Sequence, residues 1–431
     1  MALPVARGFT AGPQVFGRTL LQSGVRVVTE ELAGRPTVSL GVWVGSGSRV
    51  ERAGLEGGAH FIEHLLFKGT KKRTAAALAK EIDAIGGHLD AFTSREYTAF
   101  YLNLLVDHLE RGMDILSDIL LRSTFPANEV ERERRVILEE IRSAEDNPED
   151  CAYELLVQGL WGGSSLGLPI LGSHESVGKV PRARLLEFFA ENYRSGNLVF
   201  AAAGGVTHEH LERLWRRYFP FPKRPHPPAR RSAPRVKPGF YSRARDLEQI
   251  YLNFACAGLE QDHADRYALY VLNTIIGGSM SSRLFQEVRE KRGLAYSVFS
   301  SHAAYRDAGL FTVSVGTRPD QAVRVVRIVR RELERIAAQA PGAKEMARAR
   351  DHLKGNLVLG LESGGHRMMK LAKQEIYFGR QFTIEDTLER IDEIAPEQLR
   401  RLAGRLFDHA RSAWSAVGPA ASIEKVAQEV A

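Results

Sequence analysis

Three residues in one short segment have the types and spacing needed to hold a metal ion and use it in hydrolysis. His60 and His64 are four residues apart in the stretch AHFIEHLLF, and Glu63 stands between them. Residues four apart on a helix share one face and lie ~6 Å apart along its axis, which lets two imidazoles bind one metal ion. Glu63 borders the same face, where a carboxylate can act as general base toward metal-bound water. The segment therefore predicts metal-assisted hydrolysis.

The order of these residues is the inverted pattern H-x-x-E-H, which is typical of the inverzincin class of zinc peptidases. The chain has 13 histidines and 52 acidic residues among 431, so that about 0.05 such matches are expected by chance. The competing interpretation is two surface histidines with a solvated carboxylate between them.

A catalytic zinc ion needs a third protein ligand and an open position for water. A strongly charged helix further along the chain supplies many carboxylates, most of which should form a solvated face. Glu133 and Glu140 are seven residues apart and therefore share one face. Val136 and Ile137 lie between them, and this apolar flank favours an inward orientation of the face. The residues alone do not choose between Glu139 and Glu140 as the third ligand.

The chain divides at residues 220–239, a segment rich in proline and arginine and poor in periodic apolar positions. We predict an N-terminal domain over 1–219, this linker, and a C-terminal domain over 240–431. Near the end of each half an amphipathic helix, a polar break and an apolar strand follow in the same order, at 185–206 and at 399–419. Because strands are segregated from helices without regular βαβ alternation, two copies of one α+β unit are the economical interpretation.

Composition and charge argue against several other classes of protein. The chain is 44% hydrophobic and 26% charged, as globular proteins are, and it has no run of ~18–20 apolar residues that could span a membrane. Cys151 and Cys256 are its only cysteines, which excludes a disulfide scaffold and fits a reducing compartment. A dispersed net charge of +7 is a weak argument for nucleic-acid binding. We expect neither a nucleic-acid nor a membrane partner.

The segment around His60 and His64 resembles the zinc-site helix of the pitrilysin and insulysin family of metallopeptidases, and more closely its mitochondrial processing peptidase branch. The spacing of 76 residues between His64 and Glu140 matches the third ligand of that family. The resemblance implies one zinc ion per chain, bound by His60, His64 and Glu140. It implies Glu133 as a residue supporting the site from behind and Glu63 as the general base. It also implies a fold of two homologous domains, each a mainly antiparallel sheet covered by helices.

Residues 86–102 resemble the strand of this family whose backbone pairs with an extended peptide substrate. The resemblance implies substrate binding along Asp90, Ala91, Phe92 and Thr93. The family commonly has Asn where this chain has Asp90, and a local role in capping a turn before Ala91 is an alternative for this carboxylate.

Residues 277–298 resemble the segment that bears an arginine–tyrosine pair in the family, matched here by Arg289 and Tyr296. The implied role of the pair is to hydrogen-bond the scissile carbonyl and stabilise its oxyanion. Without the resemblance, Arg289 would be interpreted as a helix-surface residue and Tyr296 as a core residue of a strand, within a helix over 282–291 followed by a strand.

The leading hypothesis is a zinc endopeptidase that acts on peptides or unfolded protein segments. The alternative is a non-catalytic core or partner subunit of a peptidase or respiratory complex, but such relatives usually have eroded zinc motifs. The chain has two of the units that pitrilysin-like enzymes carry as four, which implies a homodimer or a heterodimer with a related subunit. The first 24 residues lack the apolar region of a secretory signal. We expect a bacterial-type cytoplasmic location rather than the mitochondrial matrix.

Overall fold

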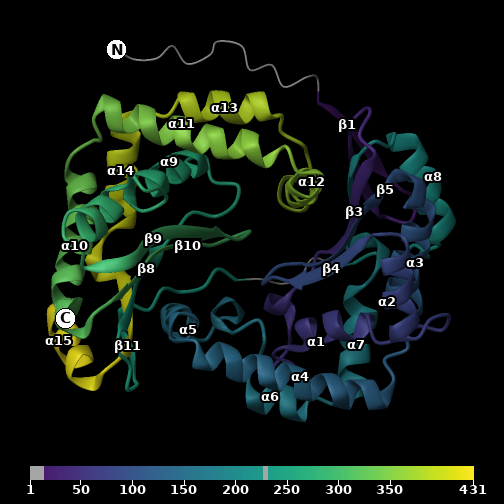
Figure 1. Cartoon of the computed structure of the whole chain (residues 1–431), viewed down its shortest axis with the longest axis horizontal. Coiled ribbons are helices and arrows are strands. Elements are labelled where there is room, and N and C mark those ends of the chain that lie inside the picture. Colours follow the sequence, from purple (N-terminus) through teal and green to yellow (C-terminus); the bar gives the residue numbers. More distant parts are fainter. Residues whose placement is uncertain (1–13, 227–231) are drawn as a thin grey trace.

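Two β-sheets form the centres of the two halves of the molecule (Figure 1). The computed structural model describes residues 14–226 and 232–431. The first sheet has the strand order β1-β2-β6-β3-β5-β4. Its strands are Val15–Leu20 (β1), Arg26–Glu31 (β2), Thr37–Val44 (β3), His88–Thr93 (β4), Thr98–Leu105 (β5) and Leu198–Gly204 (β6). The second sheet has the order β7-β11-β8-β10-β9. Its strands are Gly239–Ala244 (β7), Ile250–Ala257 (β8), Ala295–Ala304 (β9), Gly309–Thr317 (β10) and Ser412–Gly418 (β11).

The two sheets repeat one topology. In each, the strand that begins the unit pairs in parallel with the strand that ends it, as β2 does with β6 and β7 with β11. The other neighbours within each unit are antiparallel. The first sheet adds β1, which pairs antiparallel with β2. The expected α+β fold with two homologous, mainly antiparallel sheets covered by helices is therefore confirmed.

Helices of the first half cover one face of the first sheet. They are Gly58–Leu66 (α1), Ala75–Ala84 (α2), Leu109–Arg122 (α3), Ala127–Asp146 (α4), His174–Lys179 (α6), Arg182–Asn192 (α7) and His208–Tyr218 (α8). Their apolar side chains share one buried core with the sheet. The corresponding core of the second half joins the second sheet to Arg266–Ile276 (α9), Ala322–Ala338 (α10), Pro396–Leu406 (α14) and Ala420–Val430 (α15). Ala343–Gly360 (α11) and Ile384–Asp392 (α13) pack beside α9.

The opposite face of each sheet is covered by a helix from the other half. Pro148–Leu160 (α5) packs on β11, β8 and β7, and Gly364–Phe378 (α12) packs on β6, β2 and β3. Figure 1 shows α12 beside the first sheet and α5 beneath the second. This exchange closes both sheets with apolar contacts, so packing crosses the covalent division between the halves. The predicted limits at 219 and 240 stay a prediction, and residues 1–13 and 227–231 of those segments lie outside the described residues.

An ion pair with a buried carboxylate joins α12 to the first sheet. The carboxylate of Glu375 is fully buried and accepts hydrogen bonds from Arg18 of β1 at 2.9 and 3.0 Å. Arg26 of β2 donates to the Glu375 backbone carbonyl at 3.1 Å. A buried carboxylate without such partners would be strongly unfavourable, so these contacts fix the position of α12 on the sheet.

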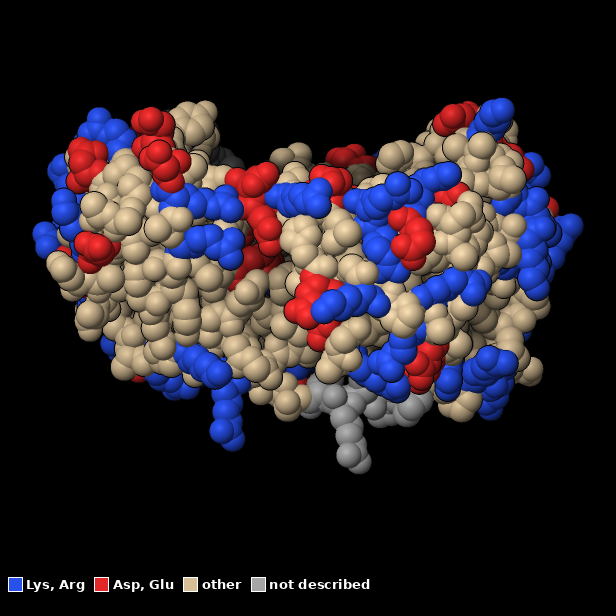
Figure 2. Space-filling view, turned by 90° about the horizontal axis from the view of Figure 1, so that it is seen from below, with Lys and Arg blue, Asp and Glu red and all other residues tan. Residues whose placement is uncertain are grey.

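None of the helices within residues 14–226 and 232–431 is long and apolar enough to cross a membrane. On the face shown in Figure 2, Lys and Arg side chains are spread over both halves and alternate with Asp and Glu.

Candidate metal centre

Helix α1 places His60 and His64 on one face. Phe61, Ile62 and Leu65 are fully buried in the core of the first half, so the other side of the helix carries the two imidazoles. Their ring centres are 4.6 Å apart. The helical spacing predicted from the sequence is therefore present, and the burial of three apolar neighbours sets the direction in which both rings point.

The start of α1 is fixed by backbone geometry and by one carboxylate. Gly57 has a φ of 88°, in the left-handed region that favours glycine, and an added Cβ would lie 2.5 Å from the carbonyl oxygen of Leu171. The Glu51 carboxylate accepts the N–H groups of Gly57 and Ala59 at 3.0 and 2.7 Å. Because the first N–H groups of a helix have no partner inside it, this carboxylate helps to hold α1 in place.

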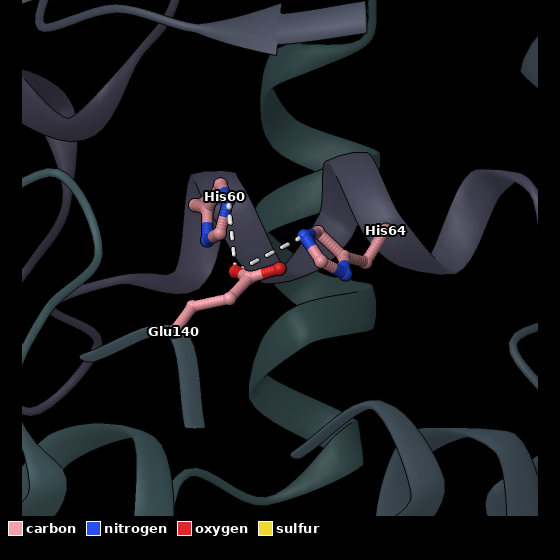
Figure 3. Close-up of side chains that lie close together, drawn as sticks. All are labelled: His60, His64 and Glu140. Carbon is pink, nitrogen blue, oxygen red and sulfur yellow. Dashed lines mark ion pairs between the residues drawn. The ribbon is translucent and has the colours of Figure 1, made fainter. Parts of the chain in front are cut away.

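Glu140 of α4 faces both imidazoles (Figure 3). Its Oε2 lies 3.8 Å from Nε2 of His60 and 3.6 Å from Nε2 of His64. One donor atom from each of the three residues falls within 4.8 Å of the others. Two imidazoles and one carboxylate are a donor set of catalytic zinc sites, so these residues fit a zinc ion. Glu139 points elsewhere: its side chain is 67% exposed and pairs with Arg142.

Glu133 lies behind His64. Its Oε2 is 3.1 Å from Nδ1 of His64, its Oε1 accepts from Lys68 Nζ at 2.9 Å, and its side chain is only 3% exposed. A carboxylate on Nδ1 favours the tautomer with its proton there and leaves Nε2 free for a metal. The expectation of an inward Val136 was wrong, because this residue is 40% exposed while Ile137 is buried.

The ring of His60 is largely buried and neutral. Burial, with a smaller contribution from His64, lowers the pKa of His60 to about 3, and the neutral imidazole is the form that binds metals. Its Nδ1 is buried without a hydrogen-bond partner among the described residues. Nε2 is the nitrogen that faces Glu140, and it is the atom of this ring that could bind a metal.

Glu63 borders the two imidazoles without being one of the three converging donors. Burial raises the pKa of Glu63, while a hydrogen bond from Thr93 and the charge of His64 act in the opposite direction. The Thr93 hydroxyl donates to Oε2 of Glu63 at 2.5 Å. The carboxylate is thus near the predicted metal and held by a residue of β4.

A cavity of about 510 Å³ opens beside His60 and Glu63. Ala91, Phe92 and Thr93 of β4 form part of its wall. In the described chain β4 ends the strand order of its sheet, so one edge of this strand is open to a further strand. An extended peptide can pair with such an edge through its backbone, which would carry it past the candidate metal centre.

Family models match both halves of the chain. Residues 26–174 match the model described as insulinase (peptidase family M16), and residues 179–353 match the one described as peptidase M16 inactive domain. The chain belongs to peptidase family M16. This is the pitrilysin family of metallopeptidases that the sequence resembles.

Relatives of this M16 chain are similar over nearly their whole length. A protein of Streptomyces coelicolor described as an uncharacterized zinc protease is 40% identical, covering 93% of this chain and 89% of its own. A protein of Bacillus subtilis with the same description is 35% identical, covering 90% and 95%. A solved protease of Helicobacter pylori has the same fold with a TM-score of 0.88 at 21% identity, covering 94% of this chain and all of its own.

Arg289 and Tyr296 of this M16 chain lie side by side. Arg289 belongs to a π-helical segment, Phe285–Glu290, within the helix expected over 282–291. Its guanidinium carbon is 4.7 Å from the centre of the Tyr296 ring. Tyr296 is 83% exposed and is therefore not a core residue. Neither is among the described residues that line the cavity beside His60, and their role in catalysis stays a prediction.

The Asp90 carboxylate is engaged within its own sheet. Oδ1 accepts the backbone N–H of Ala91 at 2.8 Å, and Oδ2 accepts the hydroxyl of Tyr101 at 2.8 Å. Asp90 and Ala91 both lie within β4, so this bond is local but does not cap a turn, and the capping alternative considered for Asp90 was wrong. Its contact with substrate stays a prediction.

Two contributors to the site were not predicted from the sequence. Thr93 was predicted to bind substrate, and its bond to Glu63 is an addition from the structure. The other contributor is the cavity wall formed by α5 and β7, with Asp150 and Glu154 on the helix and Arg243 on the strand. Asn147 and Pro148 do mark the start of α5, but this local signal says nothing about where the helix packs.

Proposed function

We propose that the protein is a zinc-dependent endopeptidase that hydrolyses peptides or unfolded protein segments. The observation that carries the proposal is the convergence of His60, His64 and Glu140 beside Glu63, at a cavity bordered by an open strand edge. The relatives described as zinc proteases support zinc as the metal, with one ion per chain.

The chain's own residues divide the work of hydrolysis. Bound zinc would polarise the scissile carbonyl and lower the pKa of water. Glu63 takes a proton from that water and later delivers it to the leaving amine. The backbone of β4 at Ala91, Phe92 and Thr93 holds the substrate in an extended form, and Glu133 keeps His64 oriented.

The test combines metal analysis with a peptide-cleavage assay on the purified full chain. We expect close to one zinc ion per chain and cleavage of members of a peptide library. Chelation should abolish that cleavage and added zinc should restore it, because the metal supplies the reactive water. Cleavage that resists chelation would contradict the proposal. A zinc-loaded protein without cleavage would instead favour the alternative of a non-catalytic core or partner subunit.

We propose further that Arg289 and Tyr296 stabilise the oxyanion of the substrate, which requires β9 to approach the cavity. Tyr296→Phe removes one donor with little change in shape. Loss of one oxyanion donor typically costs ~10²–10³ in kcat. We expect kcat/KM of Tyr296→Phe to fall by ~10-fold or more, with zinc content unchanged. Ser297→Ala, an exposed neighbour on β9, is the matched control. Unchanged kcat/KM for both Tyr296→Phe and Arg289→Ala would show that neither residue stabilises the oxyanion.

The assembly is part of the same proposal. Two repeated units per chain support a pair of chains, either as a homodimer or with a related subunit, since closed pairs are the commonest assemblies. The named relatives are bacterial, and we propose a bacterial cytoplasmic enzyme rather than a mitochondrial one.

A further inference from the structure

The side chain of Thr93 contacts the proposed general base directly. Thr93 is the last residue of β4, and its hydroxyl donates to Oε2 of Glu63 at 2.5 Å. A hydroxyl bonded to one carboxylate oxygen restricts the rotation of the group and leaves the other oxygen, Oε1, outside that bond. The side chain of Thr93 therefore has a contact that substrate pairing through the backbone does not explain.

The turn that follows Thr93 is internally braced. The Ser94 backbone N–H donates to the carbonyl oxygen of Tyr97 at 2.8 Å, and the Ser94 hydroxyl donates to the same oxygen at 2.9 Å. The Tyr97 N–H donates back to the Ser94 hydroxyl at 3.1 Å. These three bonds join the end of β4 to the start of β5 and limit the movement of Thr93.

The second half of the chain holds this turn from outside. Glu96, in the turn, is only 2% exposed. Its Oε1 accepts from Arg49 at 2.7 Å, and its Oε2 accepts the backbone N–H of Arg306 at 3.1 Å. Arg49 also donates to Asp307 at 2.8 Å. Arg306 and Asp307 lie between β9 and β10, so the tip of that hairpin is joined to the turn through the buried side chains of Arg49 and Glu96.

We propose that Thr93 is a positioning residue for Glu63, and that the tip of the β9–β10 hairpin holds Thr93 in place through Glu96 and Arg49. The inference rests on the proposed peptidase function, and it gives the second half a role in aligning the general base. Reacting groups must be held within ~0.5 Å of their productive geometry, and a displacement of 1 Å can cost ~10²-fold in rate.

The first experiment compares Thr93→Val with Thr93→Ser. Valine keeps the branched shape and removes the hydroxyl, whereas serine keeps the hydroxyl. We expect Thr93→Val to lower kcat by ~10–100-fold with KM and zinc content unchanged, and Thr93→Ser to restore most of kcat. Equal kcat in wild type and Thr93→Val would overturn the proposal. So would a raised KM with unchanged kcat, because the side chain would then serve substrate binding.

The contribution of the second half is tested by Asp307→Asn, which keeps the shape of the side chain and removes its charge. We expect kcat to fall by about several-fold, less than in Thr93→Val. Arg49 still donates to Glu96 in this variant, but its second acceptor is no longer ionised. Zinc content should not change. An unaltered kcat for Asp307→Asn would overturn the holding role of the hairpin.

A measurement that does not depend on catalytic activity separates this inference from the proposed function. In metal-free protein, the melting temperatures of Thr93→Val, Glu63→Ala and the double variant form a cycle that reports the coupling of the two side chains. Non-additive shifts would support the contact, and additive shifts would overturn it. If wild type shows no chelator-sensitive cleavage, the proposed function fails, while the thermal cycle still decides the contact between Thr93 and Glu63.

Discussion

Replacing Glu63 by glutamine is expected to abolish peptide hydrolysis while the protein keeps its zinc. An amide cannot accept the proton of the attacking water, and general-base catalysis contributes typically 10²–10⁴-fold, so kcat should fall by at least about that factor. Zinc should remain because Glu63 is not one of the three donors that converge in the structure. Steady-state kinetics on a cleaved peptide, with zinc measured on the same sample, checks both parts.

The matched control for Glu63→Gln is Glu175→Gln. Glu175 lies on the surface of α6 and pairs with Lys179, so its replacement should leave kcat unchanged. The amide of Glu63→Gln can still accept the Thr93 hydroxyl, and the site should keep its shape. Near-normal hydrolysis by Glu63→Gln would show that another group is the base.

The local sequence pattern predicted the residues of the site that lie on helix α1. His60, Glu63 and His64 belong to α1, and their mutual position follows from helical geometry alone. The glycine that begins this helix and the apolar residues that orient it are also local. No contact with a distant segment is needed to place the two imidazoles on one side, which is why the sequence predicts them.

The rotation of α4 about its own axis could not be predicted in the same way. One residue along a helix turns the side chain by about 100°, so periodicity allows either Glu139 or Glu140 to face α1. The structure decides through packing, since Val130, Ile137 and Ile141 are buried and Val136 is not. Resemblance to the family selected Glu140 as the third ligand. The apolar flank was predicted to consist of Val136 and Ile137, but only Ile137 is buried.

The exchange of α5 and α12 between the halves was beyond any local signal. A helix with an apolar face must be buried, yet the pattern does not name the sheet that buries it. The Arg18–Glu375 pair that fastens α12 joins residues 357 positions apart. The same exchange brings α5 to the cavity, so its wall residues, among them Glu154, were missed together with the packing.

Replacing Glu140 by glutamine is expected to remove zinc or greatly weaken its binding. Oε2 of Glu140 lies 3.8 and 3.6 Å from Nε2 of His60 and His64, and a neutral amide is a poorer ligand for a divalent cation. Loss of a supporting residue around a metal typically costs ~10–100-fold in affinity, and loss of a ligand should cost at least as much. Zinc titration and metal content of the purified variant check this directly.

Glu139→Gln provides the matched control, because the two glutamates are neighbours and the same atom is changed in each. Glu139 is exposed and pairs with Arg142, so its replacement should leave zinc content and kcat unchanged. A ligand that binds only the folded state raises the melting temperature in proportion to the logarithm of its concentration over Kd. Added zinc should therefore stabilise wild type and Glu139→Gln but have little effect on Glu140→Gln. Equal zinc content and equal thermal shifts in wild type and Glu140→Gln would mean that Glu140 is not a ligand, and that the third donor must be sought elsewhere around the cavity.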